Sequence, residues 1–424
     1  MPSAAREHRP AIRDRAPAPA GPGRPGLMLA VATVGFVLNF WAWALISPLG
    51  PHFKTALGLS AGQQALVVAV PVIVGSLGRI PVGALTDRFG GRVMFPVVSF
   101  ATIVPVLFVG LWGYDSYALL LIGGFFLGIG GTAFAVGVPF VNAWFPPERR
   151  GFAVGVFGAG MGGTAVSALT TVKLMDAGNI HLPFLITAAV LAAYGVAAWL
   201  LLRDAPGRVA PSGSFVTRLA AAGRLRLTWQ LALLYAVAFG GYVAFSVYLP
   251  TYLKTAYGLG QQDAANRMAG FVILAVVARP LGGWLSDRID PTRVLTVAFA
   301  VVVAGALVQS GTPSLAPLGT IAFLAMAAAL GAASGAVFAL VARRAPADMV
   351  GSVTGVVGAA GGLGGFLPPL VMGSVYSHYD DYAAGLVALA VVAAGCLAFT
   401  ALWRPRPVAG SPSSRRPSTR VQGG

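Results

Sequence analysis

Twelve long runs of apolar residues constrain the fold of this 424-residue chain more than any other feature. A helix that crosses a bilayer needs about 20 mostly apolar residues, and these runs have or approach that length. They are apolar on all sides, whereas the strands of membrane barrels alternate with a period of two. We therefore predict an all-α membrane protein with twelve transmembrane helices, at 27–49, 63–86, 92–113, 117–144, 150–175, 182–202, 229–250, 264–286, 294–310, 317–342, 350–376 and 383–403.

The composition agrees with this prediction and explains the charge. Hydrophobic residues make up 57% of the chain, charged residues 10%, and the net charge is +16. With the N-terminus in the cytoplasm, 23 of the 29 Lys and Arg residues fall in the tails and loops on the cytoplasmic side. This asymmetry follows the positive-inside rule and predicts that both termini are cytoplasmic. The basic balance then requires no nucleic-acid partner, although attraction to anionic membrane lipid is expected.

The two terminal segments are predicted to be disordered tails. Residues 1–26 hold five arginines and many Pro and Ala, and no small-residue cleavage site follows, so we predict a basic tail instead of a signal peptide. A transit peptide is the alternative, but Pro-rich sequence disfavours an amphipathic helix. Residues 404–424 are rich in Ser, Pro, Arg and Gly and are also predicted to be disordered. The single cysteine, Cys396, can form no internal disulfide.

The chain repeats itself at an offset of 200 residues. "KTALGL" at 54–59 returns as "KTAYGL" at 254–259, and "RIPVGALTDR" at 79–88 returns as "RPLGGWLSDR" at 279–288. The sequence therefore predicts two homologous six-helix halves, at 27–202 and 228–403, joined by a cytoplasmic linker at 203–227. Parallel repeats of this kind form a substrate site at their interface near the bilayer midplane and rock about it to expose it to each side in turn.

A charged loop between the second and third spans resembles a motif of the major facilitator superfamily. The motif is "GALTDRFGGR" at 83–92, and its counterpart in the second half is weaker. The matching residues that the resemblance assigns to conformational gating are Gly83, Asp87, Arg88, Gly90, Arg92, Asp287 and Arg288. Carboxylates and arginines at helix ends can pair in one state of the cycle and separate in the other. A role in topology alone is the alternative.

Two arginines stand deep inside predicted spans. Arg79 and Arg279 are the only formal charges there, since no Asp, Glu or His lies in mid-span. Each costs about 2.5–3.5 kcal/mol on insertion scales. Each could extend toward the cytoplasm, but we favour a second interpretation, in which the pair faces a central cavity and an anionic substrate is the missing counter-ion. The planar donors of guanidinium suit flat oxyanions.

The surroundings of these arginines resemble the nitrate/nitrite porter family within that superfamily. The similarity lies in "GRIP" and "ARPLGG", which contain Arg79 and Arg279, and in the glycine-rich stretches at 155–168 and 355–369. It implies that the two arginines grip the anion from the two halves, with aromatic rings on both sides. By motif position the rings are Phe134, Tyr235 and Phe239. For Phe134, ordinary helix packing is an equal alternative.

The glycine-rich stretches are predicted to let helices pack closely and slide during the cycle, with an indirect role in binding. The glycines concerned are Gly158, Gly160, Gly162, Gly163, Gly358, Gly361, Gly362, Gly364 and Gly365. One residue departs from the family: Met161 stands where many members carry an asparagine. The departure leaves open whether the substrate is nitrate, nitrite or another anion. Asn39 and Asn142 could supply the missing amide, but each suits helix-to-helix bonding better.

Together these features predict a secondary active transporter for nitrate and/or nitrite in a bacterial cytoplasmic (inner) membrane. The bias of 26 Arg to 3 Lys is typical of a GC-rich bacterial genome. The absence of a titratable residue in mid-span favours nitrate/nitrite exchange, while proton-coupled uptake stays open. The alternatives are a carrier of another small anion, such as cyanate or a small carboxylate, and an anion sensor that does not transport.

No enzyme is predicted. The sequence has no nucleophile with a base and no metal-ligand cluster, and its glycine-rich stretches lie inside apolar spans instead of following a strand, as a nucleotide-binding loop would. We expect no cofactor and no metal. The expected partners are a small inorganic anion and membrane lipid, and the expected state is a monomer.

Overall fold

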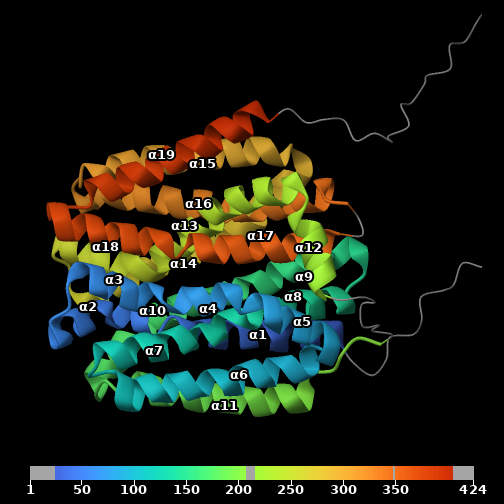
Figure 1. The fold of residues 1–424 in the computed structure, drawn as a ribbon, viewed down its shortest axis with the longest axis horizontal. Coiled ribbons are helices and arrows are strands. Elements are labelled where there is room, and N and C mark those ends of the chain that lie inside the picture. The colour runs from blue at the N-terminus through green and yellow to red at the C-terminus, as the bar shows by residue number, and fades with distance from the viewer. Residues whose placement is uncertain (1–23, 207–214, 347–348, 404–424) are drawn as a thin grey trace, which may run out of the picture.

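The structure, a computed structural model, describes residues 24–206, 215–346 and 349–403. Every regular element in this part of the chain is helical (Figure 1). It holds twelve helical segments that are long and apolar enough to cross a membrane. The predicted fold class is confirmed.

Most spans of the first half are built from several helical pieces. The elements are α1 (Pro25–Trp43) and α2 (Ile46–Leu57); α3 (Ala61–Ala69), α4 (Pro71–Leu77) and α5 (Arg79–Phe89); α6 (Gly91–Phe108) with the π turn η1 (Val109–Gly113); α7 (Tyr117–Leu127), the 3₁₀ turn η2 (Gly128–Thr132) and α8 (Ala133–Trp144); α9 (Pro147–Gly158), the 3₁₀ turn η3 (Ala159–Gly162) and α10 (Gly163–Ala177); and α11 (Leu182–Leu201).

The second half has longer unbroken helices. After the short α12 (Phe215–Gly223) come α13 (Arg226–Tyr257), α14 (Gln261–Arg288), α15 (Pro291–Ser310), the π turn η4 (Leu315–Gly319) with α16 (Thr320–Arg344), α17 (Val350–Gly364) with α18 (Leu367–Tyr379), and α19 (Ala383–Leu402). The helix α12 lies inside the linker predicted at 203–227, where no helix was expected.

The local sequence explains where several helices begin and end. Ser60 and Gln63 form a capping box that starts α3, and the Asp290 side chain caps α15. The helices α2 and α13 both end at a glycine in the left-handed conformation, Gly58 with φ 62° and Gly258 with φ 65°. Glycine adopts this conformation without a Cβ penalty. The two turns are 200 residues apart, so the repeat extends to the backbone.

The helical bundle has two ends. Because the described chain crosses the bundle twelve times, it starts and finishes at the same end, here called the terminal end. The opposite end, with the turns at Gly58 and Gly258, is called the far end. In Figure 1 the first half (blue to green) and the second half (yellow-green to red) lie side by side, with α6 and α11 at one edge and α15 and α19 at the other.

Large apolar side chains remain exposed on these edge helices. Val104 of α6 is 69% exposed, Trp199 of α11 is 53%, Val297 of α15 is 65% and Val391 of α19 is 65%. The chain folds with this surface apolar because lipid tails, not water, contact it. This is the surface of a multi-pass membrane protein.

Hydrogen bonds join the two halves at the far end. The Ser47 hydroxyl donates to the carbonyl oxygen of Val247 at 2.7 Å, and Gln64 Nε2 donates to Thr251 Oγ1 at 2.9 Å. Ser47 and Val247 occupy equivalent positions of the two halves, so the pseudo-two-fold axis passes between them. These bonds hold the far end closed.

The predicted spans agree with the structure except at their ends. The first span continues to Leu57, beyond the predicted end at 49, because α2 remains helical through its less apolar second half. Most of the tail predicted at 1–26, the whole tail predicted at 404–424, and residues 207–214 of the predicted linker lie outside the described residues.

Candidate functional site

Arg79 stands at the break between α4 and α5. The side chain is half-buried, and its Nη1 donates a hydrogen bond to the carbonyl oxygen of Gly358 in α17 at 3.2 Å. Its Nε donates to the carbonyl oxygen of Gly131 in η2 at 3.4 Å. Arg79 therefore reaches from the first half to the glycine-rich helix of the second.

Arg279 makes the corresponding reach in the opposite direction. It lies in α14, also half-buried, and its Nη1 donates to Met161 Sδ in the glycine-rich η3 of the first half. Its Nη2 donates to the Tyr235 hydroxyl at 3.0 Å. Each arginine thus contacts the glycine-rich segment of the opposite half.

Three phenylalanine rings frame the two guanidinium groups. Arg79 Cζ lies 5.3 Å from the ring centre of Phe134 and 5.7 Å from that of Phe239. Arg279 Cζ lies 5.6 Å from the centre of Phe239 and 5.7 Å from that of Phe338. All four distances are within cation–π range. Phe239 is shared by both arginines and brings them to one site.

Tyr235 completes this site from the same helix as Phe239. The two rings stack at 5.0 Å with parallel planes, and the Tyr235 ring meets Phe338 edge-on at 4.7 Å. Tyr235 is 1% exposed and Phe239 is 3% exposed. A Cβ added at Gly361 would overlap the Tyr235 ring, so this glycine admits the tyrosine.

The site carries two positive charges with neutral partners. Among the residues that the structure describes, no carboxylate forms an ion pair with Arg79 or Arg279; their partners are carbonyl oxygens, a sulfur atom, a hydroxyl and ring faces. In a bilayer such charges are unfavourable without compensation. The arrangement is suited to binding a small anion.

Open space lies beside Arg79. Gly158 and Gly358 are both buried, yet a Cβ added at either position would meet no heavy atom within 4 Å, and the same holds for the half-buried Gly162. The carbonyl group of Gly358 also accepts from Arg79. Gly358 therefore has room for a further atom close to Arg79.

The remaining predicted glycines are packing positions. An added Cβ would overlap a neighbour at Gly160 (Phe36), Gly163 (Val37), Gly361 (Tyr235), Gly362 (Ser76), Gly364 (Ala236) and Gly365 (Val243). The Gly362–Ser76 approach joins α17 to α4 across the interface between the halves.

The loop motif lies at the terminal end, apart from the arginine site. Gly90 has φ 84°, and a Cβ there would overlap the Asp204 carboxylate, which also accepts from the Arg92 backbone N–H at 3.2 Å. Arg88 is exposed and lies over Phe89. This contact joins the loop to the start of the predicted linker. Sequence reasoning missed Asp204, which lies shortly after the sixth span ends at Leu201.

The other members of the motif lie nearby or in the second half. Gly83 lies close to Ala135, and Asp87 is half-buried. Asp287 and Arg288 are exposed, and Arg288 Cζ stacks 4.0 Å from the centre of the Trp284 ring.

The structure adds two residues to the predicted site. Phe338 was missed, although it lies four residues, or one helical turn, beyond the position equivalent to Phe134, and therefore on the same helix face. Met161 was noted only as a departure, but its sulfur accepts from Arg279. Asn39 is fully buried and donates to Ser99 Oγ at 2.9 Å, so its amide is used between helices.

Known proteins are similar to this chain over nearly its whole length. The family model "Major Facilitator Superfamily" matches residues 32–369. "Probable nitrate/nitrite transporter NarK2" of Mycobacterium tuberculosis is 49% identical, covering 90% of this chain and 97% of that protein. "Nitrite extrusion protein" of Bacillus subtilis is 36% identical, covering 87% of this chain and 92% of that protein.

Solved structures agree on the fold. A bacterial homologue of the human lysosomal transporter Spinster, in an inward-facing and occupied conformation, aligns with a TM-score of 0.69 over 91% of this chain and 100% of its own. Its sequence identity is 20%, so this likeness concerns the fold alone. From the family match and the two bacterial relatives, the chain belongs to the major facilitator superfamily and, within it, to the nitrate/nitrite porter family.

Proposed function

We propose that this protein carries nitrate and/or nitrite across the bacterial inner membrane by alternating access, exchanging one anion for another. The observation that carries the proposal is that Arg79 and Arg279, from the two halves, contact the same ring, Phe239, without a carboxylate partner among the described residues. The printed names of the two bacterial relatives support the choice of anion.

The site suits a flat, singly charged oxyanion. Guanidinium presents planar donors that match two oxygen atoms at once, and a trigonal or bent anion can lie against an aromatic face. We assign anion binding to Arg79 and Arg279, with Phe134, Phe239 and Phe338 as the flanking rings. Tyr235 holds Arg279 in place. The anion offsets the charge that otherwise makes the site unfavourable in the bilayer.

The hydrogen-bond partners of the arginines support exchange. Each arginine bonds to the glycine-rich segment of the opposite half, at Gly358 and Met161. A bound anion competes for these donors and offsets one of the two positive charges, which reduces their mutual repulsion and permits the halves to rock. An empty site returns slowly, so inward and outward movements of anions are linked.

The proposal includes the moving parts and their orientation. The halves 27–202 and 228–403 are the rocking bodies, 203–227 is the cytoplasmic linker, and both termini are cytoplasmic. The loop motif, with Asp87 and Arg88, then acts as a gate at the cytoplasmic ends of the helices. The far end is periplasmic.

The test is anion flux in proteoliposomes loaded with nitrite, with nitrate outside and no pH gradient. We expect exchange by the wild type and loss of exchange in Arg79→Lys and in Arg279→Lys, because lysine keeps the charge and removes the planar fork. Arg267→Lys is the matched control, since Arg267 is an exposed arginine paired with Asp263. Nitrate and nitrite flux in the wild type no greater than in protein-free liposomes, with or without a pH gradient, would overturn the proposal.

A further inference from the structure

A polar cavity lies between the two halves at the far end. It has a volume of about 500 Å³ and is lined by residues of both halves: Pro51, Lys54, Thr55, Gly58, Leu59, Gln64, Lys254 and Thr255. We call it the far-end cavity. Two of its lining residues, Lys54 and Lys254, occupy equivalent positions of the repeat.

The helix geometry places both lysines over the pseudo-two-fold axis. Lys54 is seven residues beyond Ser47, and Lys254 is seven residues beyond Val247, the pair that marks the axis. Seven residues are about two helical turns, so each lysine lies on the same helix face as its axis residue and about 10 Å farther out. The two ammonium groups therefore flank one entrance to the interface.

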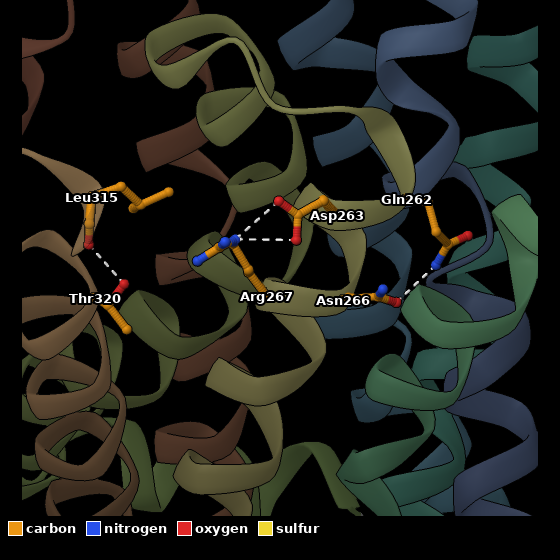
Figure 2. Close-up of polar contacts among 6 residues, drawn as sticks. All are labelled: Gln262, Asp263, Asn266, Arg267, Leu315 and Thr320. Carbon is orange, nitrogen blue, oxygen red and sulfur yellow. Dashed lines mark hydrogen bonds and ion pairs between the residues drawn. The ribbon is translucent and has the colours of Figure 1, made fainter. Parts of the chain in front are cut away.

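The charges of these lysines are not neutralised by the described residues. Neither forms an ion pair there, and Lys54 Nζ lies 5.7 Å from the centre of the Tyr376 ring. Arg267 at the same end shows the contrast, because its Nε donates to both oxygens of Asp263 at 3.2 Å (Figure 2). Only four Lys and Arg residues lie on this side of the predicted topology, and two of them line this cavity.

The inner boundary of the cavity is the closed contact between the halves. Gln64 lines the cavity and donates to Thr251, and the Ser47–Val247 bond lies deeper. When the far end opens, these bonds separate and the way to the arginine site starts at the lysines.

We propose that the far-end cavity is an outer collecting site for small inorganic anions, which Lys54 and Lys254 concentrate before the gate of Gln64 and Thr251 opens. The inference rests on the proposed function for the identity of the anion. The positive potential of the cavity comes from the two lysines and does not depend on that function.

The transport test compares the double variant, Lys54→Gln with Lys254→Gln, with the wild type at low ionic strength. Two charges at the entrance raise the local anion concentration, so we expect the KM for nitrate added at the far-end side to rise about fivefold at an unchanged maximal rate. We expect the KM for anion added at the terminal-end side to be the same in both proteins. The difference in far-end KM between the variant and the wild type should disappear at high salt, because salt screens the lysine charges. Lys173→Gln, an exposed lysine on the same side outside the cavity, is the matched control.

A second test needs no transport. Thr55 is exposed in the cavity, and the buried Cys396 is the only native cysteine. In a Cys396→Ser background, Thr55→Cys reacts with an anionic and a cationic methanethiosulfonate in detergent. We expect the ratio of anionic to cationic rate to fall several-fold when both lysines become glutamine, and nitrate to slow the anionic reagent.

The outcomes separate the two proposals. An unchanged rate ratio, or an unchanged KM at low salt in an active protein, overturns the collecting site while nitrate transport stands. A wild type that moves no nitrate but keeps the lysine-dependent ratio overturns the proposed function and retains an anion-collecting cavity.

Discussion

Arg279 donates a hydrogen bond to the Tyr235 hydroxyl at 3.0 Å, and the Tyr235 ring stacks on Phe239. Arg79, the equivalent arginine, has no such hydroxyl partner among the described residues and bonds to two backbone carbonyl groups instead. The site is therefore symmetric in its charges and asymmetric in the way they are held. A partner side chain can be replaced by mutation, whereas a backbone carbonyl group cannot. The positioning of Arg279 can therefore be tested by replacing its partner Tyr235, and that of Arg79 cannot be tested in this way.

Tyr235→Phe removes the hydroxyl and keeps the ring stack. We expect a KM for nitrate about tenfold higher, because hydrogen bonds to charged groups contribute about 1.5–3 kcal/mol. The measurement is the concentration dependence of exchange in proteoliposomes. Tyr194→Phe, which removes a hydroxyl remote from the arginines, serves as the control. An unchanged KM would show that Tyr235 does not position Arg279.

Phe239→Leu is expected to weaken substrate binding more than Phe338→Leu. The Phe239 ring contacts both arginines, whereas the Phe338 ring contacts Arg279 alone. Each lost cation–π contact costs about 0.5–2 kcal/mol, so we expect roughly tenfold and threefold increases in KM. Equal effects of the two variants would contradict the shared position of Phe239.

The fold and both arginines followed from the sequence because they depend on simple signals. Apolar length defines the spans, and an exact offset of 200 residues pairs Arg79 with Arg279. Neither signal depends on packing. The aromatic positions Phe134, Tyr235 and Phe239 came from the family resemblance, and the structure places all three beside an arginine.

The partners of the arginines could not be predicted, because they depend on how helices cross. The repeat predicts equivalent residues, but Phe338 lies one turn away from the equivalent of Phe134. The glycine stretches also differ: the first contains a 3₁₀ turn at Ala159–Gly162, while α17 continues to Gly364. Packing against different neighbours decides between such states, and composition alone does not encode it.

Gly361→Ala should destabilise the protein, whereas Gly358→Ala should not. A methyl group at Gly361 overlaps the Tyr235 ring, whereas one at Gly358 enters open space. We expect Gly361→Ala to lower the free energy of unfolding by about 1–3 kcal/mol, as overpacking does, and Gly358→Ala to leave it nearly unchanged. Thermal unfolding in detergent measures both. Comparable melting temperatures for the two variants would contradict the packing role of Gly361.

Exchange of isotope-labelled nitrate for nitrate should be nearly independent of pH between 6 and 8. No Asp, Glu or His lies in mid-span, and the arginines remain charged throughout this range. The histidines at the far end lie away from the arginine site; His181, for example, has Nδ1 at 2.6 Å from the carbonyl oxygen of Gly110. Nitrate is used on both sides because protonated nitrite crosses lipid unaided.

A change in the exchange rate of less than about twofold across this range would fit exchange without a protein-bound proton. The decisive companion measurement is accumulation of labelled nitrate against its gradient when an inward proton gradient is imposed. Accumulation would contradict exchange and show that a proton moves with the anion. If that proton is carried by the protein, the histidines are the groups to replace first: His52→Gln, His181→Gln and His378→Gln, with His8→Gln in the N-terminal segment as the control.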